Sequence, residues 1–135
     1  MRSDFIFSEN GEVTDDEIFS LRNSVGWDNN CYPFSITKDR SFVHFTIRFN
    51  RKLIGFLDVV SDGFNDAYIR DLMIAKEHQS CGLGTNLMNH ALKYLKDKQI
   101  KCIQVTFDPR LTGYYKRFGF NMIGAGIIDK DDPNC

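Results

Sequence analysis

The stretch EHQSCGLGTNLMNHAL, residues 77 to 92, places Gly82 and Gly84 at the start of an amphipathic helix. The start of a helix exposes unpaired N–H groups and carries partial positive charge, and glycines let a phosphate approach the backbone closely. The stretch therefore predicts either an anion site or a glycine-rich turn that binds nothing. The apolar stripe of the helix consists of Leu83, Leu87, Met88, Ala91, Leu92 and Leu95.

Two common phosphate-binding patterns do not fit this turn. A P-loop has Lys and then Ser or Thr directly after its second glycine, whereas Thr85 and Asn86 follow Gly84 here. A dinucleotide-binding turn has a third small residue where Leu87 stands, and it follows the first strand of a parallel unit. The sequence therefore excludes both patterns.

The remainder of the chain predicts an α+β protein. Residues 14 to 17, TDDE, form a capping box that starts a helix, which ends at Gly26. Alternating apolar residues from Phe42 onward predict three strands with links too short for crossovers, and therefore an antiparallel meander. We expect a mixed, mostly antiparallel sheet flanked by helices. The expected strands are 4–7, 42–49, 53–60, 67–74, 102–107 and 122–128, and two further helices are expected at 83–98 and 111–118.

Composition limits the classes of protein. A chain of 135 residues predicts a single domain, 1–135, and its net charge of −1 gives no basis for binding nucleic acid or an anionic membrane. No apolar stretch approaches a membrane span, and the N-terminus lacks the apolar core of a signal peptide, so we expect a cytoplasmic protein. The four cysteines are scattered singly, which predicts free thiols and no metal site.

Three motifs carry a resemblance to a known family. The spacing Gln79-x-x-Gly82-x-Gly84 resembles the coenzyme A pyrophosphate loop of the GNAT superfamily of N-acyltransferases. RDLMIA, residues 70–75, precedes the loop by the distance that the family requires, and in the family this strand splays from its neighbour. YYKRFGF, residues 114–120, looks like the family's Tyr-x-x-x-Gly-Phe signature, with its tyrosine at Tyr115. The order of elements is also similar, so the resemblance predicts the GNAT fold.

The resemblance implies acetyl-CoA as co-substrate. Two departures concern its binding: Ser80 and Cys81 are neutral where many members carry Arg or Lys, and Asp108 stands where many carry Asn. Phosphate binding would then depend on backbone N–H groups. The cofactor-binding residues implied by the resemblance are Leu72, Met73, Ile74, Gln79, Ser80, Cys81, Gly82, Leu83, Gly84, Thr85, Asp108 and Tyr115.

The implied reaction is direct attack of a primary amine on acetyl-CoA in a ternary complex. A backbone N–H of Met73 or Ile74 would stabilise the oxyanion, and Tyr115 would donate a proton to the departing thiolate. Asp71 is the preferred general base. The alternatives are Asp66, His78, or a chain of waters without any protein base.

The acceptor is the least determined part of the prediction. Trp27 and Tyr32 are the expected aromatic wall for a small-molecule amine, although Trp27 could equally pack beneath the first helix. The alternatives are a protein or peptide acetyltransferase acting on a lysine or an N-terminus, and a non-catalytic sensor that binds acyl-CoA. A homodimer is possible for any of these.

Overall fold

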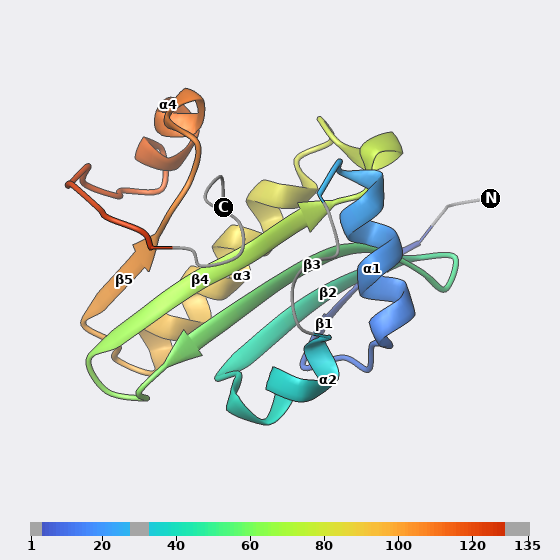
Figure 1. The fold of residues 1–135 in the computed structure, drawn as a ribbon, viewed down its shortest axis with the longest axis horizontal. Helices are drawn as coiled ribbons and strands as arrows, with labels where there is room; N and C mark the ends of the chain where they lie inside the picture. Colours follow the sequence, from blue (N-terminus) through green and yellow to red (C-terminus); the bar gives the residue numbers. More distant parts are fainter. Residues whose placement is uncertain (1–3, 28–32, 129–135) are drawn as a thin grey trace. The chain divides into compact units, whose positions relative to one another are not determined.

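The computed structural model describes residues 4–27 and 33–128, which fall into two compact units, Met1–Val105 and Thr106–Cys135 (Figure 1). We describe each unit by itself, and the single-domain interpretation stays a prediction. The elements of the first unit are β1 (Phe5–Glu9), α1 (Asp15–Ser24), α2 (Phe34–Thr37), η1 (Lys38–Arg40), β2 (Val43–Phe49), β3 (Lys52–Ser61), β4 (Asp66–Ile74), η2 (Lys76–His78), α3 (Leu83–Asp97) and β5 (Cys102–Val105).

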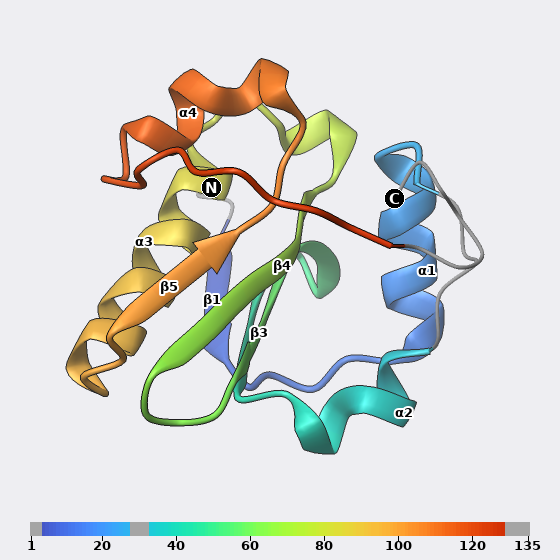
Figure 2. The same cartoon turned by 60° about the vertical axis from the view of Figure 1, so that its left-hand side comes forward.

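The sheet of the first unit has the strand order β1-β2-β3-β4-β5. β1 to β4 are antiparallel neighbours, whereas β5 pairs parallel to β4 after the crossover through α3. Figure 2 shows α3 on one face of this sheet and α1 and α2 on the other. The predicted α+β class and the mixed, mostly antiparallel sheet are therefore confirmed.

Side chains of α1 and of its N-cap residue cap the start of this helix. Glu17 N–H donates to Thr14 Oγ1 over 3.1 Å, and Thr14 N–H donates to Glu17 Oε1 over 3.0 Å, so the predicted capping box is present. Arg48 on β2 donates to both carboxylate oxygens of Glu17, at 2.6 and 2.9 Å. These bonds, with that of Arg48 foremost, lower the pKa of Glu17 to about 2.

The two faces of the sheet are covered differently. On the α3 face the predicted helix stripe is buried apart from the half-buried Leu92, with Leu87 and Leu95 at most 1% exposed. Burying each such leucine stabilises the fold by roughly 1.5–3 kcal/mol. On the other face Phe34 of α2 packs edge-on against Phe56 and against the buried ring of His44. The short helix α2 and the turn η1 were not predicted from the sequence.

The second unit contains η3 (Pro109–Leu111) and α4 (Thr112–Lys116). The strand predicted at 102–107 ends at Val105, and the strand predicted at 122–128 is wrong, because those residues have no strand structure and are exposed. Gly124 and Gly126 interrupt that apolar run, and glycines contribute no side chain for packing in a strand. Among the described residues, β5 pairs with β4 alone.

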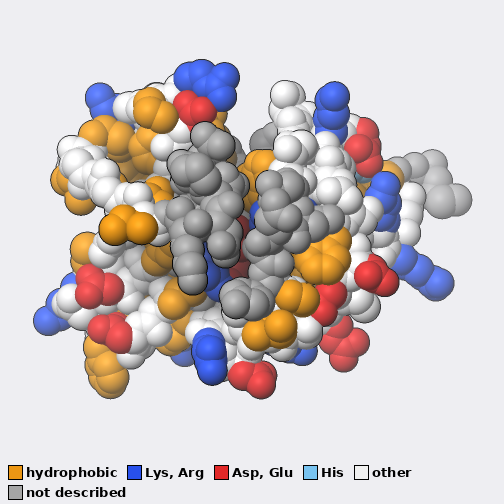
Figure 3. Space-filling model, viewed as in Figure 1, with side chains coloured by type: hydrophobic (Ala, Val, Ile, Leu, Met, Phe, Trp, Pro, Cys, Tyr) orange, Lys and Arg blue, Asp and Glu red, His pale blue; other side chains and the backbone are white. Residues whose placement is uncertain are grey.

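The surface carries both signs of charge. Acidic and basic side chains are interspersed on the face of the molecule in Figure 3, in keeping with the net charge of −1. None of the described helices combines the length and the apolar character that crossing a membrane requires.

Candidate active site

A β-bulge in β4 shapes the centre of the candidate site. Arg70 pairs with Asp58 and Met73 pairs with Phe56, so Asp71 and Leu72 together oppose the single residue between them on β3. Asp71 has a positive φ of 57°, which is uncommon for a residue other than glycine. A bulge bends its strand and redirects a side chain. This bulge turns the Asp71 carboxylate toward α1, where Arg22 lies.

β4 parts from β5 just before the bulge. The last parallel pair joins Ile69 to Val105, and β4 continues to Ile74 without a β5 partner. Ala75 N–H donates to Ile54 O at 2.7 Å. In an antiparallel ladder, residues that hydrogen-bond to the neighbouring strand alternate with residues that do not, so the N–H and C=O of Ile74 point away from β3. The N–H of Ile74 therefore lies on the edge of β4 that faces away from β3, beyond the last pair with β5, and the splay expected from the resemblance stays a prediction.

The loop after β4 leads into the start of α3. Ser80 and Gly82 both have positive φ, 67° and 82°. Such a backbone carries little penalty at Gly82 because glycine has no Cβ. The side chain of Gln79 donates to the carbonyl of Ile74 at 2.9 Å, so it holds the loop against the end of β4. Among the described residues, no side chain caps the start of α3.

Asp71 lies between charged groups from two elements. Its carboxylate is 3.8 Å from the Arg22 guanidinium of α1, which in turn lies 5.3 Å over the ring of Trp27. Removal from water raises the pKa of Asp71, while the positive charges of Arg70 and Arg22 oppose that rise. A carboxylate with a raised pKa is a stronger base, which suits the predicted role. Trp27 is 39% exposed, so it is not part of the core.

An ion pair between a buried carboxylate and a partly exposed arginine lies near Asp71 and was not predicted from the sequence. Asp58 on β3 is 1% exposed and accepts hydrogen bonds from Arg70 Nε at 2.9 Å and from Ser41 Oγ. The bond from Arg70 fixes its guanidinium next to the bulge. The signal in the sequence was a lone carboxylate within the apolar run LIGFLDVV, residues 53–60, because a buried carboxylate needs a cationic or hydrogen-bonding partner.

Two predicted site residues lie in the second unit. Tyr115 is 8% exposed and stacks on Phe107 with ring centroids 4.3 Å apart. Burial raises the pKa of the Tyr115 phenol, and Tyr114 adds to the rise. Asp108 accepts from the backbone and the side chain of Arg110, and these bonds lower its pKa to about 2. Its carboxylate therefore starts η3 and only accepts hydrogen bonds, whereas the Asn of many family members also donates.

The other proposed bases lie elsewhere. Asp66 is the exposed first residue of β4, whereas Asp71 lies at the bulge further along the strand. The ring of His78 packs near Phe5 and Phe49, at 5.9 and 5.0 Å between centroids. The structure thus groups Asp71 with Arg22 and Trp27 but neither alternative base with them. Tyr32 lies outside the described residues.

The comparisons with known proteins agree with this geometry. A sequence model of the acetyltransferase (GNAT) family matches residues 9–120. The chain belongs to the GNAT acetyltransferase family. As a member of this family it is classed with the acyltransferases, and its sheet and helices match GNAT acetyltransferase structures.

Three relatives illustrate the membership. An uncharacterized N-acetyltransferase, ycf52, of Gracilaria tenuistipitata var. liui is 35% identical over 118 residues, which cover 84% of this chain and 65% of that protein. A proposed acetyltransferase from Deinococcus radiodurans R1 is 27% identical with a TM-score of 0.79, over 94% of this chain and 89% of the other. The GNAT protein YhbS of Escherichia coli, solved with CoA, shares the fold at 17% identity and a TM-score of 0.73, over 90% and 71% of the two chains.

Proposed function

We propose that this GNAT-family chain transfers an acetyl group from acetyl-CoA to the primary amine of a small molecule, by direct attack in a ternary complex. The observation that carries the proposal is the combination, within one unit, of an uncapped glycine-rich helix start with the open edge of β4. The helix start suits a pyrophosphate, and the strand edge offers a donor to a thioester carbonyl. CoA bound to YhbS of E. coli supports the same choice of co-substrate.

The backbone would do most of the cofactor binding. The loop side chains are neutral, so the phosphates would be held by main-chain N–H groups and the helix dipole. Gln79 would contribute by fixing the loop to β4. For the thioester carbonyl, the register favours the N–H of Ile74 over that of Met73, because the ladder directs the latter toward β3. The proposed set is Leu72, Met73, Ile74, Gln79, Ser80, Cys81, Gly82, Leu83, Gly84 and Thr85, with Asp108 and Tyr115 of the second unit.

The chain's own groups have three tasks in the reaction. Asp71 removes a proton from the attacking ammonium through water, since an ammonium has no lone pair. Ile74 N–H stabilises the negative charge that grows on the carbonyl oxygen as the C–N bond forms. As the C–S bond breaks, the nitrogen loses its second proton to water and Tyr115 donates a hydrogen bond to the departing thiolate. A phenol whose pKa lies above 10 is a weaker acid than a thiol of pKa about 8.5, so this donation stabilises the thiolate without requiring complete proton transfer.

The acceptor would lie beside Asp71. Trp27 presents a partly exposed aromatic ring next to Arg22 and Asp71, which suits an amine with an apolar body. Tyr32 is proposed for the same wall from the sequence alone. A cytoplasmic location and a homodimer stay predictions.

Thiol release from acetyl-CoA, measured across arylalkylamines, diamines, lysine peptides and N-terminal peptides, tests the proposal. Release with small amines supports it, release with peptides alone indicates a protein acetyltransferase, and binding without release on any acceptor indicates a sensor. We expect Tyr115→Phe to lower kcat at least tenfold with little change in acetyl-CoA affinity, and Tyr114→Phe is its control. Asp71→Asn should remove the acidic limb of the kcat/KM profile, whereas Asp66→Asn should leave it in place.

A further inference from the structure

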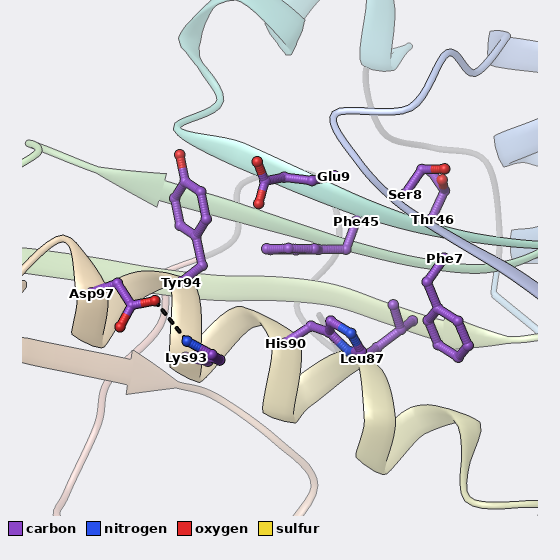
Figure 4. A pocket seen from close by; sticks show the side chains of 10 residues that line it. All are labelled: Phe7, Ser8, Glu9, Phe45, Thr46, Leu87, His90, Lys93, Tyr94 and Asp97. Atoms are coloured by element: carbon purple, nitrogen blue, oxygen red, sulfur yellow. Dashed lines mark hydrogen bonds and ion pairs between the residues drawn. The ribbon is translucent and has the colours of Figure 1, made fainter.

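A cavity of about 380 Å³ lies between α3 and the strands β1 and β2, wholly within the first unit (Figure 4). It follows α3 from Leu87 to Asp97, beyond the helix start that we assign to the cofactor. It also lies on the face of the sheet opposite to α1, and so away from Asp71 (Figure 2). Its lining residues are Phe7, Ser8, Glu9, Phe45, Thr46, Leu87, His90, Lys93, Tyr94 and Asp97.

The cavity is apolar at one end and aromatic and polar at the other. Phe7 and Leu87 lie at the first end, and Glu9 and Tyr94 lie at the second, with the ring of Phe45 between them (Figure 4). Phe45 is 4% exposed and meets Tyr94 edge-on, with ring centroids 5.9 Å apart. The cavity therefore offers aromatic faces along much of its length, in a volume typical of small-molecule sites.

The polar end of the cavity carries charges of both signs, and Lys98 Nζ lies 5.3 Å from the centroid of the Tyr94 ring. Lys93 Nζ is 2.9 Å from Asp97 Oδ2, so these two neutralise each other. Among the residues that the structure describes, the Glu9 carboxylate has no hydrogen bond or ion pair. His90 Nδ1 lies 2.7 Å from the Asn86 carbonyl, which requires its hydrogen on Nδ1 and leaves Nε2 an acceptor in the neutral ring. The His90 ring stacks on Phe7 with centroids 5.3 Å apart, so this acceptor lies at the apolar end and not beside the Glu9 carboxylate.

We propose that this cavity binds an organic ammonium ion with an apolar body. The ammonium group would form an ion pair with the Glu9 carboxylate, at the end of the cavity where Tyr94 and Phe45 lie (Figure 4). The apolar body would lie along Phe45 toward Phe7 and Leu87. This second site is separate from the proposed acceptor site and does not depend on the transfer reaction.

Calorimetry with benzyltrimethylammonium on the full chain tests the proposal. This probe has no N–H and no lone pair, so it cannot serve as an acetyl acceptor. We expect binding at submillimolar concentration and no binding of benzoate, which has a similar ring but the opposite charge. Failure of the cation to bind, or binding of benzoate in its place, would overturn the proposal.

Variants locate the site. Glu9→Gln should weaken binding of the probe at least fivefold, whereas Glu12→Gln, at an exposed carboxylate of the same segment, should not change it. Lys93→Gln should strengthen binding two- to threefold, because it frees the charge of Asp97. Asp71→Asn should have no effect. Unchanged binding in Glu9→Gln, or loss of binding in Asp71→Asn, would refute the site.

Discussion

The two long helices of the first unit begin in opposite ways. α1 starts with a capping box and three acidic residues in its first turn, so its own side chains accept from the N–H groups of Thr14 and Glu17, and Arg48 holds the Glu17 carboxylate. α3 starts at Gly82 in a left-handed conformation, with no acidic residue in its first turn and, among the described residues, no side-chain cap. A capped helix start contributes stability, whereas an uncapped one remains available to an anion.

The largest effect should follow from filling the start of α3. Gly84→Leu places a branched side chain in the second residue of the helix, where the proposed pyrophosphate would approach the backbone. We expect acetyl-CoA affinity to fall at least 100-fold by calorimetry, with the helix intact because leucine favours helices. Asn89→Leu, an exposed position further along α3, is the matched control. Equal affinity in Gly84→Leu and the parent chain would show that α3 does not bind the phosphates.

Adding a cation to the loop should produce the next largest effect. Cys81 is exposed and neutral, and Cys81→Arg would supply a charge-assisted bond that the loop lacks. We expect about tenfold tighter binding of acetyl-CoA in low salt, with the gain shrinking as salt is raised. Cys102→Arg, at an exposed cysteine of β5, should bind as the parent chain does. A gain of the same size in Cys102→Arg would indicate a nonspecific effect of charge.

Removing the side-chain cap of α1 should lower the stability of the fold without changing acetyl-CoA binding. Thr14→Ala removes the side chain that accepts from Glu17 N–H, and we expect a loss of about 1 kcal/mol in the free energy of unfolding. Urea titration measures this loss, and Ser20→Ala, at an exposed position of α1, is the control. Acetyl-CoA affinity should stay unchanged, and a drop in affinity would mean that the two helix starts are not independent.

The smallest expected effect is a loss of stability at low pH. The pKa of Glu17 falls from 4.5 to about 2 on folding, so its contribution is fully present above pH 4.5 and is lost as the pH falls toward 2. The stability difference between the parent chain and Glu17→Gln should therefore shrink over that window. We expect at most on the order of 1 kcal/mol, because the pair is partly exposed. A difference that stayed constant from pH 5 to pH 2 would contradict the assignment.

The sequence predicted features that depend on local patterns. The capping box of α1, the strand β2 and the stripe of α3 each follow from neighbouring residues, and all three are present, although His44 and Thr46 of β2 are buried as well as the apolar residues that alternate with them. The bulge was not predictable, because Asp71 takes a positive φ only through the pairing of β4 with β3. The pair of Asp58 and Arg70 likewise depends on strand register. The strand expected at 122–128 failed because apolar residues alone do not supply a partner strand.

The fixed connection from Ile74 to Gly82 has a consequence for ligand length. Gln79 ties the loop back to the carbonyl of Ile74, so the Ile74 N–H and the start of α3 are held at a set separation. A ligand can engage both only if its carbonyl and its anionic group are the same distance apart. The loop would then select ligands by the distance between these two polar groups as well as by their chemical type.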